Sequence, residues 1–582
     1  MYLKWLPSPD RLVAKYADSP LVQTAGGLER RKHGNTLEKS GDSESVCREF
    51  EFRREKESKI MLTAAEENAK TPLRSSPARP ARSVLSNWAT YFLSGAVSFF
   101  LSPFIVRHLG NSAYGVWVLL VSMTGYLGFL DLGIRGAVTR YVAKFHSERD
   151  HEKSSRTVSS ACALFLAAGA IAIVTSVIFS IWALPRFKIP PSYLKAAQLV
   201  VLLAGLNVAV SLISGVFGGV IVGLQRFDLL SSIAIAGIAM RAVAIFIALE
   251  NGNGLVTLAL IQLGGTICEL LLGLALTRKL YPDLRIGIGE VRSDHATLIF
   301  SFGFYAFLLH LSNYFIFFTD ALVIGAFLPV SMVTFFAIGG NLANYGRDLV
   351  GGFSRTMTPL ASQLEVEAGR PGLQHAILKQ GRYCAMAMWP IFLTFLIRGP
   401  TFIELWMGAS YAKLSGDVLR VLSLPWLFGA AASVVASGML GISQHKRVVP
   451  FALAEGLCNL VLSIALVKPI GILGVAWGTA IPNLVISIFF WPWYIRRTLG
   501  IPLGNYVYWL WLRPAMAMLP FAACTIAASR WWHAPTLLFF FVQVAAVFPS
   551  AMLGVWYLGL RSEERNAYSR SVPNYFRSVR RS

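Results

Sequence analysis

The stretch that decides the fold is VSSACALFLAAGAIAIVTSVIFSIWAL, residues 158–184, which contains no charged side chain. A helix rises about 1.5 Å per residue, so this run can cross the roughly 30 Å hydrocarbon core of a bilayer. Of the 582 residues in the chain, 55% are hydrophobic and only 14% are charged, against about a quarter charged in an average soluble domain. A soluble fold could not bury so much apolar surface, so we predict a membrane protein.

Similar apolar runs recur along the chain from residue 84 onward, separated by short polar connections. We predict an all-α polytopic membrane protein with about fourteen transmembrane helices. The least certain boundaries lie around 297–345 and 398–420. The expected spans are 84–106, 114–134, 158–184, 196–223, 229–249, 254–277, 297–319, 321–345, 383–405, 416–441, 448–467, 471–495, 506–529 and 535–559.

The chain is basic, with 53 Lys+Arg against 31 Asp+Glu and a net charge of +22. In a soluble protein this surplus would suggest nucleic acid, whereas in a membrane protein it first suggests the positive-inside rule. With the amino terminus inside, 27 of the positive residues after the first span begins fall on cytoplasmic connections and nine on external ones. We therefore predict that both termini are cytoplasmic, and nucleic acid is not needed to explain the charge.

The two ends of the chain differ from the apolar middle. Residues 1–83 carry mixed charge and few aromatic residues, which predicts a disordered cytoplasmic tail without a secretory signal. Met61 opens a short polar leader directly before the first span, so we also consider that residues 1–60 are a mis-assigned start. Residues 561–582 form a basic cytoplasmic tail.

Motifs for nucleotide binding or hydrolysis are missing from the sequence. We find no GxxxxGK[ST], no HExxH and no GxSxG, and no cysteine pair has zinc-ligand spacing. We expect no cofactor, no metal site and no enzymatic activity. A membrane glycosyltransferase or polymerase remains an alternative, although such enzymes generally need a large external loop and the external loops here are short.

An internal repeat is visible when the chain is shifted by 219 residues. The shift brings together Gly219 with Gly438, Gln225 with Gln444, Gly237 with Gly456, Ile245 with Ile464 and Gly252 with Gly471. A displacement of six helices gives two halves with the same orientation, and parallel repeats are a transporter architecture with the substrate site between the halves. We expect a first lobe at 84–280, a second lobe at 281–500, and two extra helices at 501–560.

Four short motif regions carry a family resemblance. They are residues 109–117 (LGNSAYGVW) with 128–134 (GFLDLGI), residues 223–227 (GLQRF), residues 402–408 (FIELWMG), and residues 455–460 (EGLCNL) with 471–479 (GILGVAWGT). In this order they resemble Wzx-type polysaccharide flippases of the MOP superfamily. The resemblance implies two six-helix lobes in a V around a polar cavity. It also implies alternating access, in the bacterial cytoplasmic membrane, for an undecaprenyl-pyrophosphate-linked oligosaccharide, with membrane lipids and the polysaccharide polymerase or export machinery as partners.

Two relatives within the same superfamily are rival interpretations. A MATE-type multidrug exporter would call for an acidic cation site in the first lobe, and a lipid II flippase for an arginine deep in the first helix. Residues 84–106 contain neither a carboxylate nor an arginine. Both absences favour the Wzx-type interpretation.

A pyrophosphate headgroup needs a wet, cationic cavity, and the planar fork of arginine suits it. Arg241 lies well away from both ends of its predicted span; it either faces the cavity or pairs with Glu269. Arg347 and Arg355 either line the cavity or anchor the membrane surface. For Arg135 and Arg140 the anchoring role is favoured.

Intramembrane carboxylates are candidates for ion coupling. Glu269, Asp320 and Asp131 are the candidates, whereas a structural salt bridge is favoured for Glu455. Ordinary contacts between helices are an equal alternative for the polar cavity candidates. These candidates are Asn87, Tyr91, Asn313, Tyr314, Asn341, Asn344 and Tyr345.

Overall fold

The computed structural model describes residues 78–299, 318–566 and 569, with the backbone alone at 78–89, 91, 92, 445 and 446. Residues Pro80–Ser582 form one structural unit, and all the contacts below lie within it. The described residues contain helices and no strand. The α-helices are α4 (Ala78–Tyr126), α5 (Ile134–Ser147), α6 (His151–Ile178), α7 (Pro191–Gly223), α8 (Phe227–Glu250), α9 (Leu255–Leu280), α11 (Thr319–Phe327), α12 (Ser331–Ser354), α13 (Met357–Glu367), α14 (Gly369–Met407), α15 (Ala409–Ser423), α16 (Trp426–Gly441), α17 (Val449–Ile470), α18 (Ile472–Val485), α19 (Trp491–Leu499), α20 (Leu503–Val507), α21 (Arg513–Trp531) and α22 (Leu537–Gly554).

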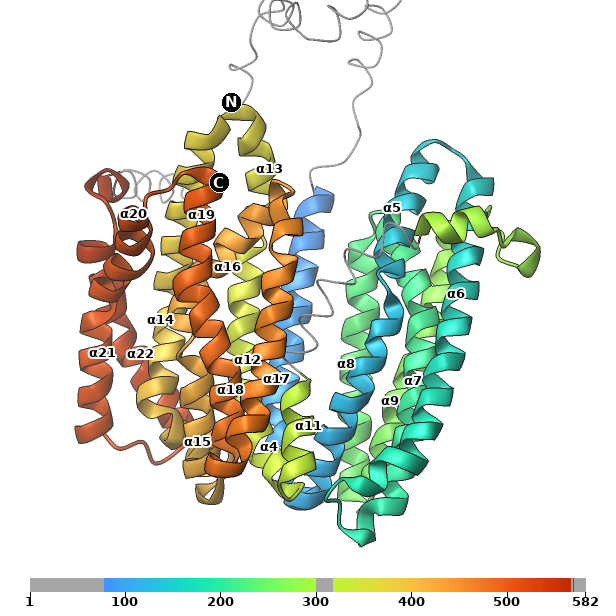
Figure 1. The fold of residues 1–582 in the computed structure, drawn as a ribbon, viewed down its shortest axis with the longest axis horizontal. Coiled ribbons are helices and arrows are strands. Elements are labelled where there is room, and N and C mark those ends of the chain that lie inside the picture. The colour runs from blue at the N-terminus through green and yellow to red at the C-terminus, as the bar shows by residue number, and fades with distance from the viewer. Residues whose placement is uncertain (1–77, 300–317, 567–568, 570–582) are drawn as a thin grey trace, which may run out of the picture. The chain divides into compact units, whose positions relative to one another are not determined.

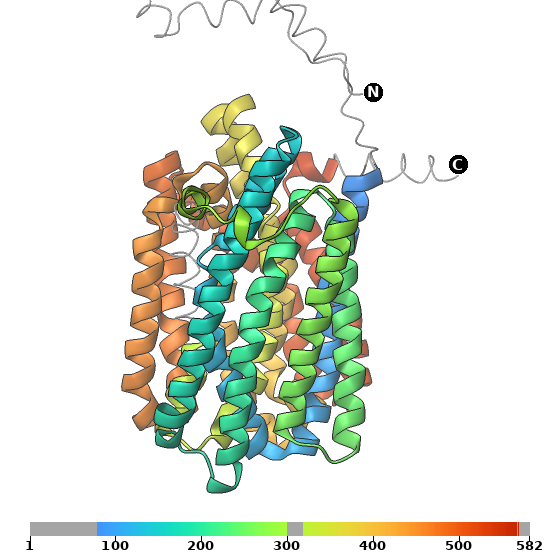
Figure 2. The same cartoon turned by 90° about the vertical axis from the view of Figure 1, so that its right-hand side faces the viewer.

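Two helix groups can be followed in Figure 1 by their packing. Helices α5–α9 pack on one another, with α7 in contact with α5, α6 and α9; we call them the first group. Figure 2 shows these teal and green helices side by side. Helices α11–α22 form the second group, whose core lies around α14, α16 and α21 and buries Phe392, Tyr506 and Phe521. Helices α5 and α13 lie at the same end of the bundle, which we call the basic end.

Ten helices of the described part are long and apolar enough to span a membrane, or eleven if α15 and α16, bent by 43°, count as one span. The predicted fourteen are therefore not confirmed as a number. The first two predicted spans are continuous in the range Leu93–Ser147. Most of the predicted span 297–319 lies outside the described residues, and α12, with its asparagines and charged residues, is too polar to be counted.

The boundary between the first two spans lies at Gly110. This residue interrupts α4 with φ +76° and ψ 168°, a backbone conformation that L-residues with a side chain rarely adopt. No atom lies within 4 Å of the Cβ that an alanine would place there. Glycine is thus needed for the turn itself, and the predicted break between residues 106 and 114 is found where expected.

The turn before α12 is not where the sequence analysis placed it. We expected a connection at residues 319–321, but α11 covers Thr319–Phe327 and the chain turns at residues 328–330. The chain 318–330 is apolar apart from Thr319 and Asp320, so hydropathy marks no boundary there. As a result Asp320 lies inside a helix and not in a loop.

A glycine with a positive φ follows both α8 and α17. Gly252 has φ +72° and Gly471 has φ +65°, and these residues are 219 positions apart in the sequence. The recurrence of a backbone angle that favours glycine at matched positions adds a structural observation to the sequence repeat.

A segment at the basic end, which we call the connector (residues 281–295), is hydrogen-bonded to one face of α6. Tyr281 binds His151 (2.9 Å), and three serines of α6 accept hydrogen bonds from connector amides. These bonds are Arg285 N to Ser155 Oγ (3.0 Å), Gly287 N to Ser159 Oγ (3.3 Å) and Arg292 N to Ser160 Oγ (3.1 Å).

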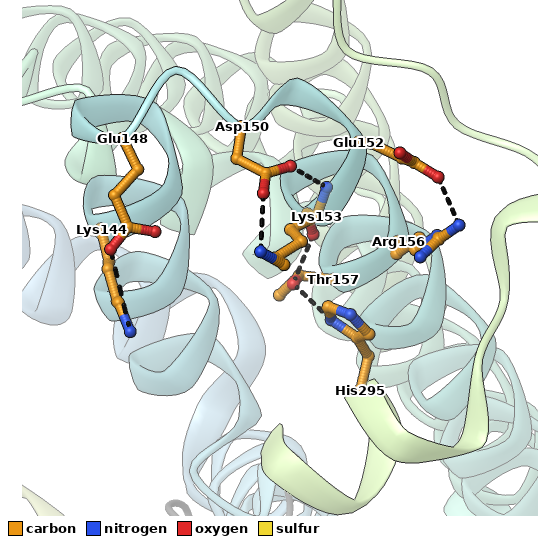
Figure 3. A network of polar contacts seen from close by, with 8 residues as sticks. All are labelled: Lys144, Glu148, Asp150, Glu152, Lys153, Arg156, Thr157 and His295. Carbon is orange, nitrogen blue, oxygen red and sulfur yellow. Dashed lines mark hydrogen bonds and ion pairs between the residues drawn. The ribbon is translucent and has the colours of Figure 1, made fainter.

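Figure 3 shows the start of α6 at the same end. His295 of the connector contacts the Thr157 hydroxyl at 3.0 Å. Asp150 caps α6 by accepting a hydrogen bond from the Lys153 amide at 2.9 Å, and the hydrogen bond from the Lys153 side chain holds the pKa of Asp150 below its ordinary value. The pairs Lys144–Glu148 and Glu152–Arg156 lie at helical spacing on this surface.

Candidate functional site

Two of the cavities in the described residues combine charged and polar side chains inside a helix group. The second-group cavity lies between α11, α12, α16 and α18, and its volume is about 560 Å³ when the open solvent at its mouth is included. It is lined by Asp320, Phe336, Gly340, Ala343, Asn344, Arg347, Leu422, Pro425, Trp426, Thr479, Ala480 and Asn483. Three residues singled out from the sequence, Asp320, Asn344 and Arg347, therefore meet in one place.

Asp320 lies in the first turn of α11 and its relative exposure is only 7%. The Thr479 hydroxyl of α18 lies 3.0 Å from each oxygen of its carboxylate. The Asn459 amide of α17 in turn donates to the Thr479 hydroxyl at 3.1 Å. No cationic side chain of the described part lies within salt-bridge distance of Asp320. A buried carboxylate with only neutral partners is costly in its charged form unless a cation or proton joins it.

Glu455 of α17 lies close to the same cavity. Its Oε1 accepts a hydrogen bond of 3.3 Å from the amide of Asn483, a cavity-lining residue. The salt bridge that we favoured from the sequence is not found among the described residues. The partner found there is an asparagine one turn after Thr479 on α18, which carries no charge.

Arg347 brings positive charge to this cavity from α12. Its side chain is 24% exposed, and its Nη2 lies 3.4 Å from Asp348 Oδ1. Asn344 lies one turn earlier on the same helix. The cavity therefore presents a guanidinium and an amide on one wall and a carboxylate on another.

The first-group cavity, between α5, α7, α8 and α9, is larger, with a volume of about 810 Å³ when the open solvent at its mouth is included. Small and hydroxyl residues form most of its wall, and Arg135 and Glu269 are its charged members. It is lined by Arg135, Thr139, Ser211, Ser214, Gly215, Gly218, Gly219, Ile221, Val222, Leu230, Ile233, Ala234, Thr266, Glu269 and Gly273.

Arg241 of α8 forms an ion pair with Glu269 of α9, with Nη2 2.8 Å from Oε1. The two side chains are 19% and 27% exposed. Of the two alternatives for Arg241, the structure shows the pairing. Only Glu269 of the pair lines the first-group cavity, so Arg241 acts on that cavity through its partner.

Glycines make room for these charged side chains. A Cβ on Gly265 would lie 2.5 Å from Arg241 Nε, and one on Gly237 would lie 2.4 Å from Glu269 Oε1. A Cβ on Gly215 of α7 would lie 2.5 Å from Arg135 Nε. These glycines therefore leave room for the ion pair and Arg135, and any larger residue would require these charged side chains to shift.

Arg135 is paired with Asp131 one turn before it. Its Nε lies 3.3 Å from Asp131 Oδ2, and its side chain is 48% exposed. The sequence favoured an anchoring role for Arg135, but the structure places it in the wall of the first-group cavity. Glu269 and Asp131, two of the three coupling candidates, thus each face an arginine.

The remaining candidates lie elsewhere. Arg140 and Arg355 are exposed, and neither lines the two cavities. Asn341 is hydrogen-bonded to Tyr114, as an ordinary contact between helices. Asn87 and Tyr91 belong to α4, but their side chains are outside the described part, as are Asn313 and Tyr314 as a whole.

Helix α4 is tied to the second group around its Gly110 break. Asn111 accepts hydrogen bonds through its backbone oxygen from Thr334 (2.7 Å) and through its side chain from Tyr411 (2.5 Å). The Trp406 indole donates to the Phe99 oxygen at 3.0 Å. These contacts join α4 to α12, α14 and α15.

Sequence reasoning missed Thr479, Asn483 and Trp426. A usable signal existed for the first two, since Thr479 and Asn483 are four residues apart on α18, as Glu455 and Asn459 are on α17. Polar pairs at this spacing share one helix face. In the described part no group of three or more His, Cys, Asp or Glu is arranged to hold a metal.

Comparison with known proteins agrees with this architecture. A family model described as "Polysaccharide biosynthesis protein" matches residues 81–365. A "Putative O-antigen transporter" of Shigella flexneri is 21% identical over 407 residues, covering 68% of this chain and 93% of the relative. An inward-facing multidrug resistance MATE family transporter of the MOP superfamily superposes with a TM-score of 0.62 at 16% identity, covering 71% and 94% of the two chains.

The lipid II flippase MurJ, in an inward closed conformation, superposes with a TM-score of 0.63 at 12% identity, covering 81% of this chain and 97% of its own. The chain is therefore a multi-pass membrane protein that shares the helical fold of these two solved structures. The family match and the O-antigen relative agree with the resemblance to Wzx-type flippases that the sequence motifs indicated.

Proposed function

We propose that this protein moves an undecaprenyl-pyrophosphate-linked oligosaccharide from the cytoplasmic to the outer leaflet for surface polysaccharide synthesis. The observation that carries the proposal is the pair of arginine-bearing cavities, one in each helix group of a MOP-type fold. The family match to polysaccharide biosynthesis proteins and the similarity to the O-antigen transporter support this cargo over a drug.

The chemistry of the cargo explains why both cavities contain an arginine. A lipid tail can remain in the bilayer while its pyrophosphate and sugars need polar surroundings to cross. Arg135 and Arg347 supply guanidinium forks, which bind phosphate oxygens with two parallel hydrogen bonds. We propose that the two lobes, 84–280 and 281–500, alternate their opening around this headgroup, with 501–560 as additional helices.

We place ion coupling at Asp320. Glu269 and Asp131 already have arginine partners within 3.3 Å, whereas the hydrogen-bond partner of Asp320 among the described residues is the neutral Thr479. A proton or a sodium ion bound at Asp320 would neutralise this carboxylate as the protein changes state. We propose the bacterial cytoplasmic membrane as its location, with both termini in the cytoplasm and polymerase or export machinery as neighbours.

The test is complementation of a bacterial strain that lacks its own O-antigen flippase. Arg135→Gln and Arg347→Gln are each expected to reduce surface polysaccharide, because a neutral amide loses the charge-assisted contact to phosphate. Arg278→Gln and Arg370→Gln, which remove exposed arginines outside both cavities, are the matched controls and should retain wild-type polymer. Protein amount in the membrane is measured for all four.

Two results would contradict the proposal. The first is wild-type polymer with Arg135→Gln and Arg347→Gln combined. The second is a failure to complement together with resistance to cationic drugs in a strain that lacks drug exporters, which would favour the MATE-type alternative.

A further inference from the structure

A third hollow lies away from both cavities, between α14, the single turn η7 (Tyr508–Leu512) and the segment after the last span. It is a shallow hollow, whose volume is about 250 Å³ when the open solvent at its mouth is included. Its lining includes Lys379, Arg382, Trp509, Arg561 and Glu564. None of these residues has a role in the transport proposed above.

Three guanidinium groups surround the ring of Trp509. The Cζ atoms of Arg561, Arg513 and Arg382 lie 3.9, 4.6 and 5.0 Å from the ring centroid. An aromatic face attracts a cation within about 6 Å, but three cations around one indole also repel one another. This arrangement therefore concentrates positive charge that a single aromatic ring does not neutralise.

Arg382 is the buried member of the set, with only 2% exposure. Its Nη2 lies 2.5 Å from Glu564 Oε1, and Glu564 also accepts a hydrogen bond of 3.0 Å from Tyr383. The Nε and Nη1 atoms of Arg382 have no hydrogen-bond partner among the described residues. Leaving charged donors unsatisfied in a buried position is unfavourable, so the hollow is short of acceptor oxygens.

The charges around the hollow are unbalanced. Arg513 caps the end of the last span by donating hydrogen bonds to the backbone oxygens of Leu558, Gly559 and Leu560 at 2.8–3.1 Å. Lys379 lies on α14 three residues before Arg382, on the same helix face. Glu564 is the one carboxylate in the lining, so most of the positive charge has no counterpart.

An apolar stripe begins beside the hollow and continues along the next span. Leu512, Met516 and Leu519 have relative exposures of 52%, 39% and 62%, and their spacing of four and three residues places them on one helix face. An anionic headgroup would therefore meet the cationic side chains of the hollow, and its hydrocarbon tail would meet the apolar stripe.

We propose that this hollow binds a phosphate-bearing anion, with a phospholipid headgroup as its source. The phosphate oxygens accept hydrogen bonds from Arg382 Nε and Nη1, and Lys379 and Arg561 contribute charge from the exposed rim. The acyl chains lie along Leu512, Met516 and Leu519. Basic pockets between transmembrane helices are a recognised way to bind acidic lipid headgroups.

The test uses the full-length protein in a neutral detergent. Native mass spectrometry and thermal unfolding are recorded with dihexanoyl-phosphatidylglycerol, dihexanoyl-phosphatidylcholine and inorganic phosphate. We expect one tightly held phosphatidylglycerol, a higher Tm with this lipid than with phosphatidylcholine, and weaker binding as the salt concentration rises. Displacement of the lipid by millimolar inorganic phosphate would support the anion site and assign it to a soluble phosphate source.

The variant is Lys379→Gln combined with Arg561→Gln, which leaves the buried Arg382–Glu564 pair in place. A lysine or arginine near an anionic surface contributes about fivefold in affinity, so the double variant should bind phosphatidylglycerol roughly 30-fold more weakly. The matched control, Arg496→Gln with Arg497→Gln, removes two positive residues of α19 outside the hollow and should bind as the wild type. Equal binding of the two lipids, or unchanged binding by the Lys379/Arg561 variant, would overturn the proposal.

Discussion

The two cavities hold their carboxylates in different ways. In the first group, Glu269 pairs with Arg241 at 2.8 Å, and Asp131 pairs with Arg135 at 3.3 Å. Each negative charge therefore meets a positive one across a short distance. The resulting pairs are close to neutral as they stand, and no ion has to arrive from outside to make them so.

At the second-group cavity, Asp320 and the nearby Glu455 have neutral partners among the described residues. Asp320 accepts hydrogen bonds from the Thr479 hydroxyl and Glu455 from the Asn483 amide. These carboxylates can become neutral by taking up a proton or a metal cation, and either event changes the local charge. We infer that the local charge of the first cavity is fixed by its ion pairs. The local charge of the second cavity changes when a proton or a cation binds and is therefore exchangeable.

The largest effect is expected from breaking the fixed pair. Arg241→Ala leaves Glu269 without its cation, and removing one partner of a buried pair costs up to about 3–5 kcal/mol. We expect a lower Tm and loss of surface polysaccharide while the protein still inserts into the membrane. The double variant Arg241→Gln/Glu269→Gln should recover most of the Tm, measured by thermal unfolding in detergent. A double variant as unstable as Arg241→Ala would show that the pair is not the stabilising unit.

A second prediction concerns the exchangeable side. Asp320→Asn keeps the shape of the side chain but removes its charge, so binding of a coupling ion is lost. A coupling free energy of 1–3 kcal/mol corresponds to about 5–150-fold, and we expect transport driven by an ion gradient to fall within this range. Proteoliposomes with imposed proton or sodium gradients provide the measurement, with the exposed Asp283→Asn as control. Unchanged gradient dependence in Asp320→Asn would remove the distinction between the two cavities.

Two neighbouring glycines offer a matched pair for the third prediction. A Cβ at Gly265 would lie 2.5 Å from Arg241 Nε, whereas nothing lies within 4 Å of one at Gly264. Gly265→Ala should destabilise the protein by about 1–3 kcal/mol, as overpacking does, by displacing Arg241 from Glu269. Gly264→Ala should have little effect on Tm. Equal Tm values for the two variants would mean that the ion pair adjusts freely.

The smallest effect is expected at Thr479. Thr479→Val removes the hydroxyl that donates to Asp320, a loss of about 0.5–1.5 kcal/mol for a typical hydrogen bond. We expect a modest change in the ion concentration for half-maximal transport, and Thr479→Ser should restore it. A Thr479→Val variant with the ion dependence of the wild type would show that this hydroxyl does not tune Asp320.

Much of the fold follows from hydropathy, because a helix that crosses lipid needs an uninterrupted apolar run. The break at Gly110 was predictable for this reason, whereas the turn at residues 328–330 was not, since the residues around it are nearly as apolar as the spans. Pairing between adjacent spans could also be anticipated, as for Arg241 and Glu269.

The second-group cavity could be foreseen only in parts. Asp320 and Arg347 were recognised singly because charges are rare in spans, but their meeting with Thr479 depends on the packing of α11, α12 and α18. Sequence spacing gives no register between helices so far apart in the chain. Arg135 was assigned to anchoring for the same reason, since the glycine face of α7 that receives it is visible only in three dimensions.

The connector adds a practical consequence for dividing the chain. It follows α9, beyond the predicted lobe boundary at residue 280, yet its amides are held by Ser155, Ser159 and Ser160 of α6. If the gene were split to express two halves, a first fragment ending at Leu280 would lose the hydrogen bonds that these serines accept from the connector, whereas one ending at residue 299 would keep them. Residues 281–295 therefore pack with the first half of the protein, although the sequence repeat placed the lobe boundary before them.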